Sequence, residues 1–123
     1  TAGGGVDAAS LAALLKQMKP DVAIVEHVGA MPGQGVSSTF KFGCGFGILQ
    51  GTIAALGIPM HLITPAKWKR ALGLDADKER ARALALRLWP ARADLFGRKK
   101  DHGRAEAALL ARYAAERIVG GRR

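Results

Sequence analysis

Carboxylates stand at two places in this sequence where they could bind a divalent cation. Glu26 directly follows the apolar run Val22–Val25, and Glu106 follows a basic segment that also contains Asp101 and His102. An ionised carboxylate at the end of a buried element is costly unless it is paired or bound to a metal. Magnesium prefers carboxylate oxygens and keeps water ligands for a phosphate substrate. The pattern therefore favours a magnesium site for phosphodiester cleavage, in which bound ions activate water and stabilise the leaving oxygen.

Each acid also has a simpler interpretation. Glu26 could point into solvent where a strand ends, or pair with a lysine. Asp101 could cap the last helix, because acids near a helix N-terminus complement its dipole. That explanation fits Glu106 less well, because steps of three and four residues from it reach Leu109 and Leu110. Glu106 is therefore expected on the apolar face of the last helix.

The charge of the chain is asymmetric. Nineteen Lys and Arg face ten Asp and Glu, for a formal net charge of +9. Residues 1–66 hold as many acids as bases, whereas residues 67–123 hold sixteen bases and seven acids. A one-sided positive field favours a polyanion, because neutralised phosphates release counterions. The distribution favours nucleic acid over an anionic membrane or a surface that serves only solubility.

The bases that we expect to contact the DNA backbone lie around Trp68 and around the second group of acids. They are Lys67, Lys69, Arg98, Lys99, Lys100 and Arg104. Trp68 stands between two of these lysines, where it could be either a core residue or a platform on which a base stacks.

Two features bear on the cellular setting. Residues 42–60 carry no charge and are long enough to span a bilayer, but the run contains five glycines and ends in turn chemistry, Gly-Ile-Pro. We therefore expect no membrane partner. The start of the chain does not join basic residues to an apolar run as a signal peptide does, which favours a cytoplasmic location. The single cysteine, Cys44, excludes an intramolecular disulfide and fits a small core residue.

Helices and strands alternate along the chain. Strands are predicted at 21–27 and 58–64, and helices at about 8–19, 38–56, 65–72, 76–89 and 102–118. A glycine-rich loop is predicted at 29–35, and a basic loop between the last two helices, after Pro90. In the fourth helix Ala81 and Ala85 are expected to face inward and Arg82 outward. This order predicts an α/β domain with parallel strand pairing, in which ligands bind beyond the carboxyl ends of the strands.

Capping residues mark where these helices should begin. Asp7 is the expected cap of the first helix, Ser37 or Ser38 of the second, and Asp75 or Asp77 of the fourth.

Two strands are too few for this domain. They would expose unpaired edges and could not cover several amphipathic helices. We therefore expect strands that precede Thr1 to belong to the same domain, so that residues 1–123 form a single domain that is incomplete at its N-terminus.

Four segments of the sequence resemble RuvC-type Holliday junction resolvases, especially the short phage and bacterial members. These segments are Val22–Val28, Pro32–Ser38, Ile63–Leu74 and Lys100–Ala107, and the resemblance extends over residues 5–118. It implies a ribonuclease H-like fold with a mixed sheet flanked by helices, and a homodimer. It also implies Mg²⁺ or Mn²⁺ as cofactor, a bacterial or phage-infected cell as the setting, and metal-dependent nicking of four-way DNA junctions.

The resemblance also implies roles for individual residues. Glu26 matches the catalytic glutamate at the end of a strand, and Glu106 matches the acid on the final helix. The remaining ligand falls on Asp101 or His102, so that we expect Glu26, Asp101 and Glu106 to bind metal and His102 to be a ligand or a proton-transfer group.

One departure from the family keeps other functions open. The first catalytic aspartate of the family lies in a strand motif similar to Ile-Asp-Pro-Gly, and the sequence contains no such motif; Asp7 is instead a helix cap. We therefore expect that the front hairpin that would carry the aspartate is missing from residues 1–123. A non-catalytic DNA-binding module of the same fold remains an alternative, as does another ribonuclease H-like phosphotransferase such as an integrase or transposase core.

Overall fold

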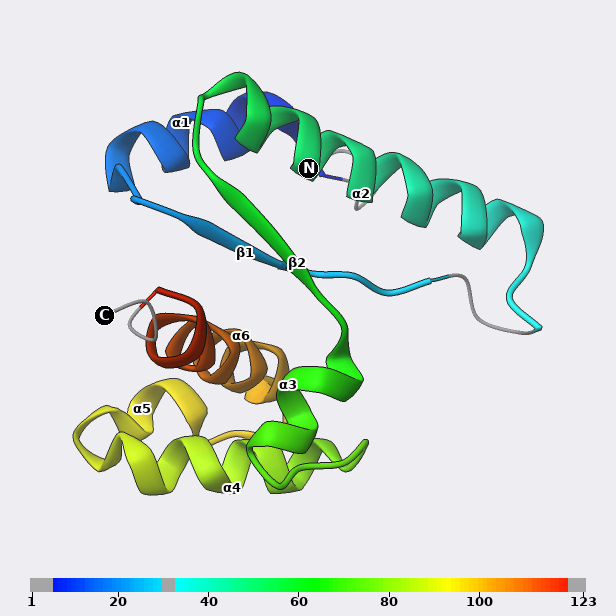
Figure 1. The fold of residues 1–123 in the computed structure, drawn as a ribbon. Coiled ribbons are helices and arrows are strands. Elements are labelled where there is room, and N and C mark those ends of the chain that lie inside the picture. The colour runs from blue at the N-terminus through cyan, green and yellow to red at the C-terminus, as the bar shows by residue number, and fades with distance from the viewer. Residues whose placement is uncertain (1–5, 30–32, 120–123) are drawn as a thin grey trace. The chain divides into compact units, whose positions relative to one another are not determined.

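The computed structural model describes residues 6–29 and 33–119, which fall into two compact units (Figure 1). The first unit is Thr1–Leu62 and the second is Ile63–Arg123. Each unit is described by itself. The expected loop from Gly29 to Gly35 falls partly on residues 30–32, which lie outside the described residues.

The first unit is a strand–helix–strand arrangement preceded by a helix. Its elements are α1 (Ala8–Met18), β1 (Ala23–Glu26), α2 (Val36–Ala55) and β2 (Met60–Ile63). The two strands form a parallel sheet, and the Ala23 amide donates to the Pro59 carbonyl at 2.8 Å. The expected α/β class with parallel pairing is confirmed at this level, and the ribonuclease H-like fold stays a prediction.

Local hydrogen bonds define both ends of helix α1. Asp7 accepts hydrogen bonds from the amides of Ala9 and Ser10, at 3.0 and 3.4 Å, which satisfies donors that the helix itself cannot pair. Lys19 adopts a left-handed conformation, with φ of 50°, and its amide donates to the Leu15 carbonyl. The predicted Asp7 cap is confirmed.

Helix α2 starts earlier than predicted and is largely exposed. Gly35 is its N-cap and makes no side-chain cap, so that the expectation of capping by Ser37 or Ser38 is wrong. Both serines lie inside the first turn, because Gly35 is the extended N-cap residue and the helix begins at Val36. Helix α1 lies alongside α2 (Figure 1), and the buried residue of α2, Ile53, lies near its carboxyl end.

The amino-terminal half of α2 leaves apolar side chains in solvent. Phe40 is 71% exposed, and Cys44 is exposed as well, so that its assignment to the core is wrong. The apolar composition of the segment was misleading, because burial depends on what packs against each face of the helix. Among the described residues, none of the helices is long and apolar enough to cross a membrane.

Apart from Ile63, the last residue of β2, the described part of the second unit contains helices and no strand. Its elements are α3 (Pro65–Ala71), α4 (Lys78–Leu88), η2 (Pro90–Arg92), α5 (Ala93–Phe96), η3 (Lys99–Asp101), α6 (His102–Ala114) and η4 (Ala115–Val119). Thr64 caps α3 and Asp77 caps α4 through side-chain hydrogen bonds. Asp77 is one of the two caps expected for α4, whereas no cap was predicted for α3. The segment from Pro90 to Asp101 was predicted as a basic loop. It instead forms a short helix and two 3₁₀ turns.

Small residues let the helices of the second unit approach closely. Ala85 of α4, Ala105 of α6 and Phe96 of α5 form a buried cluster, and the ring of Phe96 lies 5.7 Å from that of Trp89. Burial of Phe96 explains why the expected loop is ordered, since the aromatic ring anchors α5 to the core. Trp68 is fully buried, which confirms its interpretation as a core residue.

The core predicts a specific loss of stability. Phe96 is 3% exposed, and Phe96→Ala should lower the free energy of unfolding by about 3–5 kcal/mol, because it removes buried area and leaves a cavity. Urea unfolding followed by circular dichroism measures the change. The control is Phe40→Ala, the same substitution at a 71% exposed site, which should change stability by less than about 0.5 kcal/mol. Equal losses in the two variants would contradict the assignment of Phe96 to the core.

Candidate functional site

Glu26 lies where it was expected, at the carboxyl end of a strand. It is the last residue of β1 and is half-buried. A groove of about 450 Å³ runs along β1 and is lined by apolar side chains of α1 and α2, including Leu15 and Ile53. Glu26 is the charged member of that lining. The strand therefore delivers one carboxylate to an otherwise apolar surface of the first unit.

Asp101 is held tightly by a neighbour in sequence. Its side chain is 3% exposed and pairs with Arg98. One carboxylate oxygen, Oδ2, accepts from the Arg98 amide at 2.9 Å and from Nε at 3.3 Å, and Oδ1 accepts from Nη2 at 3.1 Å. The Arg98 guanidinium, followed by the Arg98 amide, holds the pKa of Asp101 below its ordinary value of 3.8.

The structural role of Asp101 differs from the expected helix cap. Asp101 directly precedes α6 but makes no side-chain cap on that helix. Its carboxylate reaches backward instead and closes the η3 turn over Arg98. The simple capping interpretation is therefore wrong, and Asp101 fixes the turn from which α6 starts.

His102 and Glu106 lie one turn apart on α6, and both are half-buried. The Oε2 atom of Glu106 is 3.3 Å from Nζ of Lys69, in an ion pair whose side chains are 18% (Lys69) and 22% (Glu106) exposed. Within the described residues, Nδ1 of His102 is buried and has no hydrogen-bond partner. A buried imidazole nitrogen without a partner is a possible metal donor, and so is a carboxylate one helical turn away.

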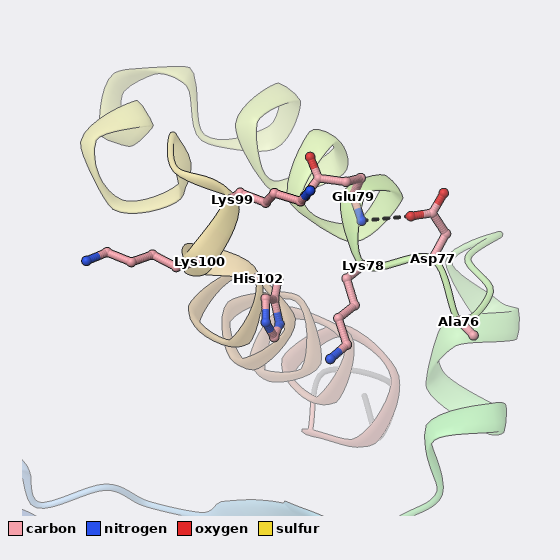
Figure 2. Close-up of a pocket in the computed structure, with 7 residues that line it drawn as sticks. All are labelled: Ala76, Asp77, Lys78, Glu79, Lys99, Lys100 and His102. Atoms are coloured by element: carbon pink, nitrogen blue, oxygen red, sulfur yellow. Dashed lines mark hydrogen bonds between the residues drawn. The ribbon is translucent and has the colours of Figure 1, made fainter.

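A pocket of about 700 Å³ opens beside His102 (Figure 2). Its lining comes from the start of α4 and from η3 and α6: Ala76, Asp77, Lys78, Glu79, Lys99, Lys100 and His102. In Figure 2, Lys78 and His102 extend to the same side, Lys99 reaches toward Glu79, and Lys100 points away. The Glu79 amide donates to Oδ1 of Asp77 at 2.9 Å, so that the helix start is already capped.

All seven acids of residues 67–123 have partners within the second unit. Six of them form ion pairs: Lys69–Glu106, Arg80–Asp75, Arg82–Glu79, Arg92–Asp94, Arg98–Asp101 and Arg112–Glu116. The seventh, Asp77, caps α4. In the part of the chain that the structure describes, Lys78, Lys99 and Lys100 form no ion pair. Because these three lysines line the pocket, the pocket carries part of the excess positive charge of the unit.

The predicted metal ligands come from both units. Glu26 belongs to the first unit, and Asp101, His102 and Glu106 belong to the second. Over residues 6–29 and 33–119, no group of three or more His, Cys, Asp or Glu side chains is arranged to hold a metal ion. The assignment of Glu26, Asp101 and Glu106 as metal ligands stays a prediction.

Sequence reasoning missed the contributions of α4. Arg82 was expected to face outward, but its Nη1 donates to the carbonyls of Phe96 and Gly97 at 3.1 and 2.9 Å. Arg82 therefore ties α4 to the end of α5, just before the η3 turn. Lys78 was also missed. A base in the first turn of a helix interacts unfavourably with the helix dipole, and this position could have indicated a role other than stabilising the helix.

Two comparisons with known proteins give different results. No protein-family model matches the chain. Over 92 residues, or 73% of the chain, the sequence is 32% identical to a protein from Chlamydomonas reinhardtii named Holliday junction resolvase MOC1, chloroplastic. The chain spans 10% of the length of that relative. This similarity supports a relationship to a Holliday junction resolvase.

The pairing of Asp101 predicts a pH-dependent loss of stability. Asp101→Asn should lower the free energy of unfolding at pH 7, because the charged form of Asp101 is favoured in the folded state. Its lowered pKa means that this contribution is present above pH 3.8 and is lost as pH falls through the folded-state pKa. The difference between Asp101→Asn and the unmodified chain should therefore shrink at acid pH. Urea unfolding at several pH values measures the difference.

The matched control is Asp94→Asn. Asp94 is also paired with an arginine, but its side chain is 64% exposed, so that the same substitution should have a smaller effect at pH 7. A destabilisation by Asp101→Asn that stays constant from pH 7 to pH 3 would contradict the role of the ionised carboxylate.

Proposed function

We propose that this chain is part of a structure-selective DNA endonuclease that resolves four-way junctions by metal-dependent phosphodiester hydrolysis. The observation that carries the proposal is the basic pocket of the second unit, whose lysines have no ion-pair partner among the described residues and which adjoins His102 on α6. The 32% identity to a protein named as a Holliday junction resolvase supports the choice of junction DNA as substrate. A short RuvC-type protein, a homodimer and a cytoplasmic location belong to the same proposal.

We propose Mg²⁺ or Mn²⁺ as cofactor, with Glu26, Asp101 and Glu106 as ligands. His102 is proposed as a further ligand or a proton-transfer group. When bound, the ions would supply an activated water and stabilise the leaving oxygen. Support is stronger for His102 and Glu106 than for Asp101, because Arg98 already binds both carboxylate oxygens of Asp101.

The proposed DNA contacts can be ranked by whether each Lys or Arg side chain already has an interaction partner in the protein. Of the expected contacts, Lys67, Lys99 and Lys100 are exposed and form no ion pair within the described residues. The other three have partners: Lys69 pairs with Glu106, Arg98 pairs with Asp101, and Arg104 donates to the Leu95 carbonyl at 3.3 Å. Lys78 joins the exposed group through the pocket. We therefore propose the exposed lysines as the principal phosphate contacts.

A second candidate function is a DNA-binding module without nuclease activity. It is favoured by one observation, that no group of three possible ligands lies together among the described residues. The two functions share the basic pocket and differ in whether the acids bind metal.

Substitution of Glu106 separates these functions. If the chain cuts junctions, Glu106→Gln should abolish Mg²⁺-dependent cleavage of a four-way junction and leave junction affinity within about twofold, because the change removes a proposed ligand without removing a base. Gel assays of nicking and binding measure the two effects. The control is Glu116→Gln, the same substitution at a side chain that is 57% exposed. Cleavage retained in Glu106→Gln would end the metal-ligand assignment, and binding without cleavage by the unmodified chain would favour the second function.

Removal of a pocket lysine should act on binding instead. Lys100→Ala should weaken junction affinity and reduce the slope of log K against log salt concentration by about one unit, as expected for one lost phosphate contact. Fluorescence anisotropy across a salt series measures the slope. Lys16→Ala serves as the control, because Lys16 is an exposed base of the first unit. An unchanged slope in Lys100→Ala would remove Lys100 from the DNA interface.

A further inference from the structure

Three aromatic rings of the first unit form a stack. The ring of Phe46 stacks on that of His27, with ring centroids 5.6 Å apart and an angle of 22° between the ring planes. The ring of Phe42 stacks on that of Phe46 at 6.1 Å and 28°. Both distances are typical of offset-stacked aromatic pairs. The stack therefore joins His27, which directly follows β1, to two successive turns of α2.

Helical spacing places this stack at the carboxyl end of β1. Leu49 and Ile53 of α2 line the groove that runs along β1. Phe46 and Phe42 continue the same face of α2 toward its N-terminus, at steps of three and four residues. Because Phe46 reaches His27, the next turn of α2 lies past the strand, and α2 extends beyond β1 on this side (Figure 1). Ligands of open α/β sheets bind beyond the carboxyl ends of the strands.

The two outer rings of the stack are open to solvent. Phe42 is 41% exposed and His27 is exposed as well, whereas Phe46 between them is half-buried. Gly43 and Gly47, which follow the two phenylalanines, have no atom within 4 Å of the position that a Cβ would take. The stack therefore retains surface on which a further planar group can lie.

The charge beside the stack favours a nucleic acid as the source of that group. Lys41 directly precedes Phe42 and is the only charged residue of α2. It is exposed and forms no ion pair within the described residues, whereas Glu26, beside His27 in the sequence, is half-buried. Sites for single-stranded nucleic acid combine aromatic rings, on which bases stack, with cations that attract phosphates. A symmetric contact with a second copy through this turn of α2 would instead bring like charges together.

We propose that the His27–Phe46–Phe42 stack is a platform for an unpaired base of DNA, with Lys41 beside the phosphate of the same nucleotide. The inference goes beyond the proposed function, because it gives the first unit a contact with bases, whereas the lysines proposed above contact phosphates. A base must leave its own stack before its face is available. The platform therefore favours DNA whose base pairing is interrupted over continuous duplex, and it tolerates any sequence because every base has a π face.

Fluorescence anisotropy with a labelled single-stranded oligothymidylate tests the platform. Phe42→Ala should weaken binding at least about fivefold, the loss typical of one base that is deprived of its aromatic partner. Phe42→Leu keeps an apolar side chain without a ring and should lose as much, whereas Phe42→Tyr keeps the ring and should stay within about twofold. The matched control is Phe40→Ala, at a 71% exposed ring two residues earlier on a different side of the helix. It should also stay within about twofold.

Two further measurements separate stacking from general adhesion. The emission of a Phe42→Trp variant should be quenched by the oligothymidylate more strongly than that of Phe40→Trp, because a stacked base quenches the indole. When the oligothymidylate is paired with oligoadenylate, Phe42→Ala and the unmodified chain should bind it with affinities within about twofold of each other, since no base face is free.

Thermal unfolding checks that each variant is folded, and the comparison of Phe42→Leu with Phe42→Tyr carries the test if Phe42→Ala is not. Equal losses in Phe40→Ala and Phe42→Ala would overturn the platform, and so would a lack of oligothymidylate binding by the unmodified chain. A lower molar mass of Phe42→Ala in light scattering, with unchanged oligothymidylate affinity, would assign the stack to a contact with a second copy instead. Single-strand binding that depends on Phe42, without junction cleavage, would keep the platform and contradict the nuclease.

Discussion

The pairing of acidic side chains with cations governs the second unit of this protein. Seven acids are distributed among sixteen bases between residues 67 and 123, and the structure gives each acid a partner in an ion pair or a helix cap. Most of these contacts are exposed and contribute little stability one by one. Their combined effect is to decide where positive charge remains. Among the described residues, the bases left without an ion pair include lysines of α3, of η3 and of the start of α4, three of which line one pocket.

The close packing of α4, α5 and α6 places those lysines. Ala85 and Ala105 remove side-chain bulk where the helices meet, and Phe96 fills the space between them. Arg82 then ties α4 to the end of α5 through two carbonyls, and Asp101 closes the following turn over Arg98. The basic pocket is therefore part of an ordered helical unit and does not belong to a flexible charged loop.

The carboxylates have two kinds of environment, and this difference bears on the function. Asp101 is saturated with donors from Arg98 and has a clear structural role. Glu106 has one lysine as its ion-pair partner, and His102, one turn earlier, has a buried nitrogen without a partner among the described residues. On α6 itself, His102 and Glu106 are the stronger candidates for chemistry. Glu26 presents its carboxylate at the end of a strand in the first unit.

Local sequence determined much of the secondary structure. The Asp7 cap, the two short strands, the Thr64 and Asp77 caps and the long final helix follow from hydrogen-bonding side chains, proline and apolar spacing, all of which act within a few residues. The candidate acids and most of the basic residues were also identifiable from type and position. The ribonuclease H-like fold, the metal ligands and the junction substrate rest on resemblance and stay predictions.

Tertiary structure decided which of these residues are available. Cys44 is apolar in context yet exposed, because its side of α2 is uncovered in the unit, and Arg82 is charged yet enclosed, because α5 supplies carbonyls for it. Glu106 forms an ion pair with Lys69, which lies 37 residues earlier in the sequence. Burial and ion pairing depend on which distant elements come together, so helical periodicity could assign Glu106 to a face of α6 but could not identify Lys69 as its partner.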